Sequence, residues 1–182
     1  MKFTSVAAVA SLAAAASAAP STPETFGLVA IRSGDAVQYS GFNAAKGSLF
    51  AGLPKQNATC EGTDDGFATF YIKDGGLYLY GTDETQQFYV DRSGMGQGKI
   101  GYTTGDSSSA PRNGELTGWS IDKNNHLVFD GSSPIACPNS IDGAYSIWAS
   151  AGVANPAGNS DCVGIAARVE KSDSPVACTY SS

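Results

Sequence analysis

Residues 70–81 read FYIKDGGLYLYG, two runs of alternating character on either side of the Asp-Gly-Gly at 74–76. Successive side chains of a β-strand point to opposite faces, and Asp-Gly between two such runs is a strong signal for a tight hairpin turn. The stretch therefore predicts a β-hairpin that places Phe70 and Ile72 together on one buried face.

The same plan recurs along the chain. Residues 119–131 form a second pair of alternating runs around an Asn-Asn turn, residues 88–102 form a third with a longer glycine loop, and residues 42–50 form a weaker version. The residues expected on the buried faces are Trp119 with Ile121 and Leu127 with Phe129. Further strands are expected at 26–31, 144–148 and 163–169.

These patterns predict an all-β protein. No stretch of a dozen residues carries a clean 3.6-residue apolar period with helix caps, so helix content should be low. Short strands with turn signals at near-regular spacing indicate a single compact antiparallel barrel or a β-sandwich. Repeated hairpins with aromatic and aliphatic pairs make a β-trefoil-like barrel the preferred form, with the β-sandwich as the alternative.

The N-terminus predicts export. Lys2 precedes an apolar, alanine-rich run at 6–16, and the Ala-Ser-Ala at 16–18 matches the small-x-small pattern of a signal-peptidase site. The run is too short to span a bilayer, and no apolar tail for a glycolipid anchor follows at the C-terminus. We expect residues 1–18 to be a signal peptide, 19–25 a polar lead-in and 26–182 a single β domain.

The four cysteines predict two disulfides. An even count in an exported chain indicates bridges, and four cysteines allow three connectivities. The preferred pairing is Cys60–Cys137 with Cys162–Cys178. A metal site is not expected, because no C-x-x-C spacing occurs and His126 is the only histidine.

The formal net charge of -6 limits the partners. Nucleic acid and anionic membranes require a basic face, so neither is an expected partner. The Asn-Ala-Thr at 57–59 is the only N-glycosylation sequon, and its polar surroundings indicate a surface loop that carries a glycan on Asn57.

No catalytic constellation is evident. The G-x-G-x-x-G at 96–101 precedes a strand, whereas a dinucleotide site needs it before a helix, so no cofactor is expected. There is no G-x-S-x-G motif, and His126 falls in or beside a predicted turn. A glycosidase would need two carboxylates across a cleft. The candidates, mostly in turns, are Asp64, Asp65, Asp91, Asp122 and Asp130.

Carbohydrate binding is the more credible chemistry. Several tyrosines alternate with core positions and stand near Asp and Asn, and such aromatic faces can stack on sugars. The alternative is that the rings cover a second buried face or pair across strands. The candidate contact residues are Tyr71, Tyr78, Tyr80, Tyr89 and Tyr102.

Three long blocks, at 91–105, 136–148 and 152–170, resemble the PhiA family of fungal cell-wall proteins. This resemblance covers nearly the whole mature chain. It implies a secreted, structural wall protein involved in the development of phialides and of conidia, the asexual spores. No catalytic residues are implied for the family, so we expect no enzyme activity.

Wall polysaccharide, whether glucan, chitin or mannan, is the expected partner of such a protein. The alternatives are a secreted glycoside-active enzyme, an inhibitor of one, or an antimicrobial effector.

Overall fold

The computed structural model describes residues 23–81 and 83–182, which form strands joined by turns and three short 3-10 helices. The strands are β1 (Thr25–Ile31), β2 (Phe42–Ala45), β3 (Ser48–Ala51), β4 (Thr59–Cys60), β5 (Phe70–Lys73), β6 (Gly76–Leu79), β7 (Gln86–Asp91), β8 (Lys99–Thr104), β9 (Gly114–Glu115), β10 (Trp119–Ile121), β11 (His126–Phe129), β12 (Ile135–Cys137), β13 (Tyr145–Trp148), β14 (Val163–Gly164), β15 (Ala166–Lys171) and β16 (Cys178–Thr179). The 3-10 helices are η1 (Ser107–Ser109), η2 (Ile141–Gly143) and η3 (Pro156–Gly158). The predicted signal peptide, residues 1–18, lies outside the described residues, as do residues 19–22 of the lead-in.

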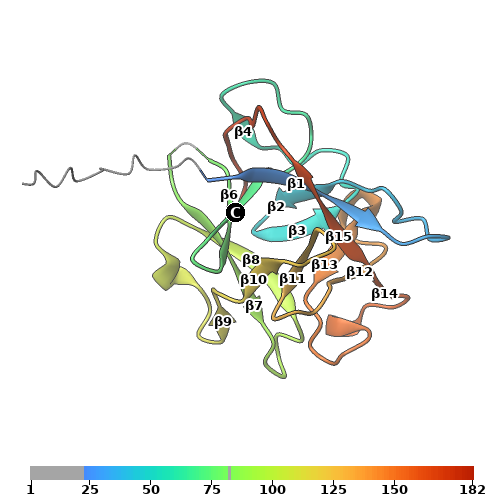
Figure 1. Ribbon diagram of the computed structural model, residues 1–182. Helices are drawn as coiled ribbons and strands as arrows, with labels where there is room; N and C mark the ends of the chain where they lie inside the picture. Colours follow the sequence, from blue (N-terminus) through green and yellow to red (C-terminus); the bar gives the residue numbers. More distant parts are fainter. Residues whose placement is uncertain (1–22, 82) are drawn as a thin grey trace, which may run out of the picture.

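Fourteen strands belong to one sheet, whose main path runs β10-β11-β15-β1-β5-β6-β7-β8-β3-β13-β12-β14. All of its pairings are antiparallel, and the sheet curls around a central core (Figure 1). A bridge from Val29 to Gly41, next to β2, brings the path β1-β5-β6-β7-β8-β3-β2 back to its start. The predicted all-β class and antiparallel, barrel-like sheet of hairpins are confirmed, and the strands that the structure describes do not form a sandwich of two facing sheets.

The quoted stretch forms the hairpin β5–β6, with Phe70 opposite Leu79 and Tyr71 opposite Tyr78. Its turn residues Asp74 and Gly75 both have positive φ, at 50° and 76°. These angles suit a turn whose twist matches the right-handed twist of the two strands. The local sequence therefore sets the register, which decides which side chains face the core.

Aromatic rings from neighbouring strands fill the centre of the curl. Phe26, Phe70, Phe88 and Tyr102 follow one another across β1, β5, β7 and β8, with successive ring centroids 6.1, 5.8 and 5.3 Å apart. All four are at most 4% exposed. Each such ring buries on the order of 150–250 Å² of surface, so this row contributes much of the hydrophobic stabilisation.

Two of the predicted core positions are not fully buried. Ile121 is 42% exposed, and Ile72 is half-buried, whereas Leu127 and Phe129 are buried as predicted. Ile121 is exposed because β10 is the end strand of the main path. Ile72, in the inner strand β5, lines with Ile121 an open hollow of about 590 Å³ rather than a closed core.

The predicted disulfide pairing is wrong, although the number of bridges is right. The structure joins Cys60 to Cys178 and Cys137 to Cys162, with Cα atoms 4.0 and 4.1 Å apart. The C-terminal segment returns to β4, so β16 pairs with β4 and places Cys178 directly opposite Cys60. The order of residues in the sequence cannot reveal this pairing, because the pairing depends on where the folded sheet places the C-terminal segment.

The same C-terminal segment closes one part of the barrel. Tyr180 is 2% exposed, and its hydroxyl accepts a hydrogen bond from the backbone N–H of Thr69 at 3.1 Å. The buried amide of Gln86 accepts from the backbone N–H of Tyr180 at 2.9 Å and donates to its carbonyl at 2.8 Å. The Tyr102 hydroxyl donates to the carbonyl of Ser181. We call residues 178–181 the C-terminal strap.

Within residues 23–81 and 83–182, no helix is long and apolar enough to cross a membrane.

Candidate carbohydrate-binding surface

Tyr71 and Tyr78 lie on the outer face of the β5–β6 hairpin. Their neighbours Phe70 and Leu77 are buried in the core, and alternation along each strand turns the two tyrosines away from it. The rings face each other across the hairpin, 5.1 Å apart between centroids and 14° from parallel. This is the cross-strand pairing that the sequence left open as the alternative, so only the ring surface that the pair leaves uncovered is open to a ligand. Both side chains are half-buried. We call this pair and the polar residues around it the tyrosine surface.

A hollow of about 340 Å³ opens beside the stacked pair. Its polar side chains offer an amide, a hydroxyl, an ammonium and a carboxylate at its edge. They belong to Gln87, Thr85, Lys73 and Asp106. Aromatic faces next to a few hydrogen-bonding groups are the composition that sugar rings require, because a sugar has apolar C–H faces and a rim of hydroxyls.

Tyr71 and Asp106, two titratable groups of this hollow, are in forms that suit hydrogen bonding to a neutral ligand. Burial, and then the neighbouring Tyr78, raises the pKa of Tyr71, so its hydroxyl stays protonated and can donate. The backbone N–H and the hydroxyl of Ser108 lower the pKa of Asp106, so it is an ionised acceptor.

Gly76 leaves room for the side chains of Tyr78 and Gln87. A Cβ atom at this position would lie 2.9 Å from the Tyr78 ring and 3.0 Å from the Gln87 side-chain nitrogen. Both contacts are tighter than a side chain normally accepts. The second glycine of the turn therefore has a role in the surface that its turn position alone does not indicate.

The five predicted contact tyrosines do not form one surface. Tyr80 is half-buried and lines a second hollow, of about 560 Å³, which also includes Tyr71. Tyr102 is 4% exposed because it faces the core beside Phe88. Tyr89 is 9% exposed, with its hydroxyl close to Gly101 and its ring close to Gly114. The prediction of sugar contact is wrong for Tyr89 and Tyr102, since neither ring face is open to a ligand.

Asn57 is exposed just before β4, with a positive φ of 54°. Both features fit the predicted surface loop. Glycosylation of Asn57 stays a prediction.

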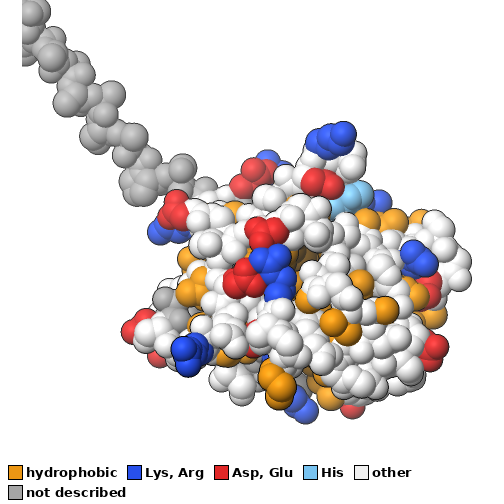
Figure 2. Space-filling model, turned by 90° about the horizontal axis from the view of Figure 1, so that it is seen from below, with side chains coloured by type: hydrophobic (Ala, Val, Ile, Leu, Met, Phe, Trp, Pro, Cys, Tyr) orange, Lys and Arg blue, Asp and Glu red, His pale blue; other side chains and the backbone are white. Residues whose placement is uncertain are grey.

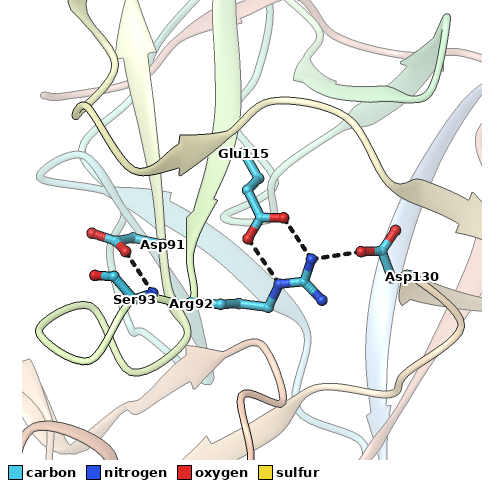
Figure 3. A network of polar contacts seen from close by, with 5 residues as sticks. All are labelled: Asp91, Arg92, Ser93, Glu115 and Asp130. Atoms are coloured by element: carbon cyan, nitrogen blue, oxygen red, sulfur yellow. Dashed lines mark hydrogen bonds and ion pairs between the residues drawn. The ribbon is translucent and has the colours of Figure 1, made fainter.

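The candidate carboxylates have structural partners. Arg92 binds Glu115 through two hydrogen bonds of 2.8 and 2.5 Å and Asp130 through one of 2.6 Å (Figure 3). The Asp91 carboxylate accepts the backbone N–H of Ser93 at 2.9 Å. The hydrogen bond from Arg92 lowers the pKa of Glu115. A glycosidase acid needs a raised pKa, so this arrangement does not suit one.

The other aspartates bond turns in their own neighbourhood, as expected for Asp in such positions. Asp64 accepts from the N–H of Gly66 at 2.8 Å, and Asp65 accepts from that of Phe67 at 3.0 Å. In the β10–β11 turn, the backbone N–H of His126, and then that of Asn124, lowers the pKa of Asp122. His126, the first residue of β11, lies beside the turn, and its Nδ1 is 3.8 Å from Asp122 Oδ2.

The glycine-rich segment at 96–101 leads into β8 and not into a helix. A Cβ on Gly98, whose φ is 95°, would lie 2.1 Å from the carbonyl oxygen of Ala149, so the glycine serves a close approach of two backbones. No group of three metal-ligating side chains gathers among the residues that the structure describes.

The arginine network is expected to hold β9 and the end of β11 to the loop that follows β7. Its guanidinium carbon lies 4.9 Å from the Phe129 ring centroid. Because the network is partly exposed, we expect Arg92→Ala to lower the free energy of unfolding by only about 1 kcal/mol. Arg168→Ala, which breaks the exposed local pair with Glu170, should change it by less than about 0.5 kcal/mol. Urea denaturation measures both, and equal losses would contradict a special role of Arg92.

The sequence model of the family of PhiA-like secreted proteins matches residues 26–181 of this chain. The chain belongs to this family. It is 84% identical to "Cell wall protein phiA" of Emericella nidulans over 182 residues, which is 100% of both chains. It is 67% identical to the protein of that name from Aspergillus fumigatus over 156 residues, 85% of this chain and 84% of the relative.

A relative from Arthroderma benhamiae, also named "Cell wall protein phiA", is 39% identical over 166 residues, 86% of this chain and 87% of the relative. No solved structure matches the chain. The membership of the PhiA-like family confirms the predicted secretion and the predicted location in the cell wall.

Sequence reasoning missed three aromatic residues that line other hollows. Trp148 borders one of about 260 Å³ with Lys99 and several hydroxyl and amide groups, and its indole N–H donates to Ser146 at 2.9 Å. Tyr39 and Phe67 are exposed and line another. None of the three stands in a predicted hairpin with an outward-facing position, so strand alternation gave no signal for them.

Proposed function

We propose that this secreted cell-wall protein is a structural, non-catalytic component that holds wall polysaccharide on its tyrosine surface. The observation that carries the proposal is the stacked pair of Tyr71 and Tyr78, half-exposed beside the hollow with Gln87 and Thr85. A rigid hairpin presents both rings, so little conformational entropy is lost when a sugar chain binds.

Charge supports a neutral ligand. On the face shown in Figure 2, acidic and basic side chains lie in small groups of opposite sign, with apolar spots between them. The net charge of -6 gives no attraction for anionic polymers. Neutral glucan and chitin need no opposite charge, and hydroxyl groups suffice for their hydrogen bonds.

A structural role fits the way in which the chain is stabilised. Two disulfides and a continuous aromatic core hold the sheet, and the carboxylates that could have served hydrolysis bind Arg92 or backbone N–H groups. Disulfides of this kind are typical of proteins that must stay folded outside the cell.

We also propose that the wall in question is that of phialides and conidia. The support is the family, whose relatives are named as cell-wall proteins, together with the developmental role that the resemblance implies. Deleting the gene and counting phialides and conidia tests this. Unchanged numbers and unchanged spore walls would refute it.

Replacing both rings should remove binding. We expect the Tyr71→Ala/Tyr78→Ala double variant of the mature chain to lose most of its retention on insoluble glucan or chitin, because two stacking faces disappear. A pull-down that compares bound and free protein measures the loss. Thermal unfolding of the variant shows whether the hairpin stays folded without the cross-strand pair.

The matched control is Tyr71→Phe/Tyr78→Phe, which keeps both rings and removes both hydroxyls. It should keep most of the retention if stacking dominates. Retention of a folded double alanine variant at the wild-type level would refute the tyrosine surface, and no retention of the wild type on either polymer would refute polysaccharide binding altogether.

A further inference from the structure

Tyr39 and Phe67 form a second aromatic site on the surface. Their side chains are 71% and 51% exposed, which is unusual for rings of this size in a chain with a well-filled core. They line a hollow of about 270 Å³ together with Asp65, Thr69 and residues 170–172 of β15 and its end.

The Phe67 ring lies over Gly41, which has no side chain. A Cβ on Gly41 would be 2.2 Å from the ring, so only glycine lets the ring rest there. The Asp65 carboxylate accepts the N–H of Phe67 at 3.0 Å, and the next N–H, of Ala68, donates to the carbonyl of Phe42 at 2.9 Å. The backbone segment that carries the exposed ring is therefore held in place.

Tyr39 has a backbone conformation that few residues adopt. Its φ is 66°, in the left-handed region, which costs energy for a residue with a bulky side chain. Its N–H donates to the carbonyl of Ala30 at 2.8 Å, which keeps the segment against β1. Strained positions of this kind are frequent at ligand sites, and here the strained residue presents an exposed aromatic ring.

The second site continues from the tyrosine surface. From residue 67 to residue 71 burial alternates, with Ala68 and Phe70 buried and Phe67, Thr69 and Tyr71 pointing outward. Four residues of extended chain span about 13 Å, which is more than one sugar ring can bridge. We infer that Tyr71, Thr69 and Phe67, with Tyr39 beside them, form one extended site for a linear neutral polysaccharide, in which several sugar units bind at once.

The charges along this path favour a neutral occupant. Glu170 is already paired with Arg168 at 2.5 Å, and Lys171 with Glu24 at 2.8 Å. Asp65, the remaining carboxylate of the hollow, accepts the backbone N–H of Phe67, and Lys171 is the only cationic side chain in the lining. No unpaired cation of the hollow is therefore left to attract an anionic polymer. Separate rings with polar gaps also fit a chain of sugars better than the continuous apolar face of a protein segment.

This inference rests on the proposed function, and a length series tests the two separately. Isothermal titration of the mature protein with glucan and chitin oligosaccharides, from disaccharide to hexasaccharide, gives the affinity for each length. For the wild type we expect the hexasaccharide of the preferred polymer to bind about tenfold more tightly than the disaccharide, as one further stacking contact provides.

The Tyr39→Ala/Phe67→Ala variant should bind the disaccharide as the wild type does but lose the tenfold gain. Gly41→Ala should weaken hexasaccharide binding in the same way, because its new Cβ displaces the Phe67 ring. The control is Met95→Ala, an equally simple removal of a side chain that is 93% exposed in the β7–β8 loop.

Each outcome decides one of the two claims. An unchanged length dependence in the folded Tyr39→Ala/Phe67→Ala variant would overturn the extended site and leave the tyrosine surface intact. Loss of disaccharide binding in that variant would place the main site at Tyr39 and Phe67 and overturn the extension from Tyr71. Absence of binding by the wild type at every length would overturn both.

Discussion

The Cys60→Ala/Cys178→Ala variant is expected to lose about 5 kcal/mol of unfolding free energy, as the loss of a bridge over a long loop implies. This disulfide joins residues 118 positions apart, whereas Cys137–Cys162 spans 25. By the same loop-entropy relation, the Cys137→Ala/Cys162→Ala variant should lose about 3.5 kcal/mol. The longer loop leaves the unfolded chain more freedom once the bridge is removed.

Guanidinium denaturation of the two variants under identical conditions measures the difference. Alanine is the suitable replacement, because Cys178 is 3% exposed and a serine would bury a hydroxyl. A larger loss from removing Cys137–Cys162 would contradict the predicted dependence of stabilisation on loop length. Peptide mapping of the unreduced wild type checks the connectivity itself.

Tyr180→Ala should cost about 3–5 kcal/mol, the range for truncating a large buried aromatic side chain. The ring is among the largest fully buried side chains, and it lies in the C-terminal strap between Gln86 and Thr69. Tyr180→Phe removes only the hydroxyl, so the lost hydrogen bond should cost about 1 kcal/mol. Denaturation followed by circular dichroism measures both, and a loss below 1 kcal/mol for the alanine variant would show that the strap does not stabilise the fold.

The pH dependence of the free energy of unfolding tests the burial of Tyr180 in a second way. Burial raises the pKa of Tyr180 from its ordinary value of 10.0 to about 12. Between these values the unfolded chain releases the phenolic proton and the folded chain keeps it, so the folded state loses stability as pH rises from 10 to 12. Tyr180→Phe lacks this group, and its stability should fall less over that interval.

Local patterns predicted most of the fold. The hairpins at β5–β6 and β10–β11 depend on alternation and on turn residues that lie a few positions apart, so the sequence alone indicates both. The burial of Leu127 with Phe129 follows from the same alternation. Ile121 departs from it because β10 is an end strand, which no local pattern reveals.

Long-range contacts account for what could not be predicted. The partner of Cys60 depends on the return of the chain's end to β4, more than a hundred residues later. Tyr102 is buried by the core and by Ser181, while Tyr71 is not, although both stand in similar tyrosine-rich strands. The position of the Phe67 ring depends on Gly41, which lies in a different segment of the chain.

The most direct test of polysaccharide binding is a nuclear magnetic resonance titration of the isotope-labelled mature protein with glucan and chitin hexasaccharides. We expect the largest shifts of backbone amide signals in β5 and β6 and in residues 65–69, with a further change at Tyr39. Changes confined to the hollow at Trp148, or no changes with either oligosaccharide, would contradict the account.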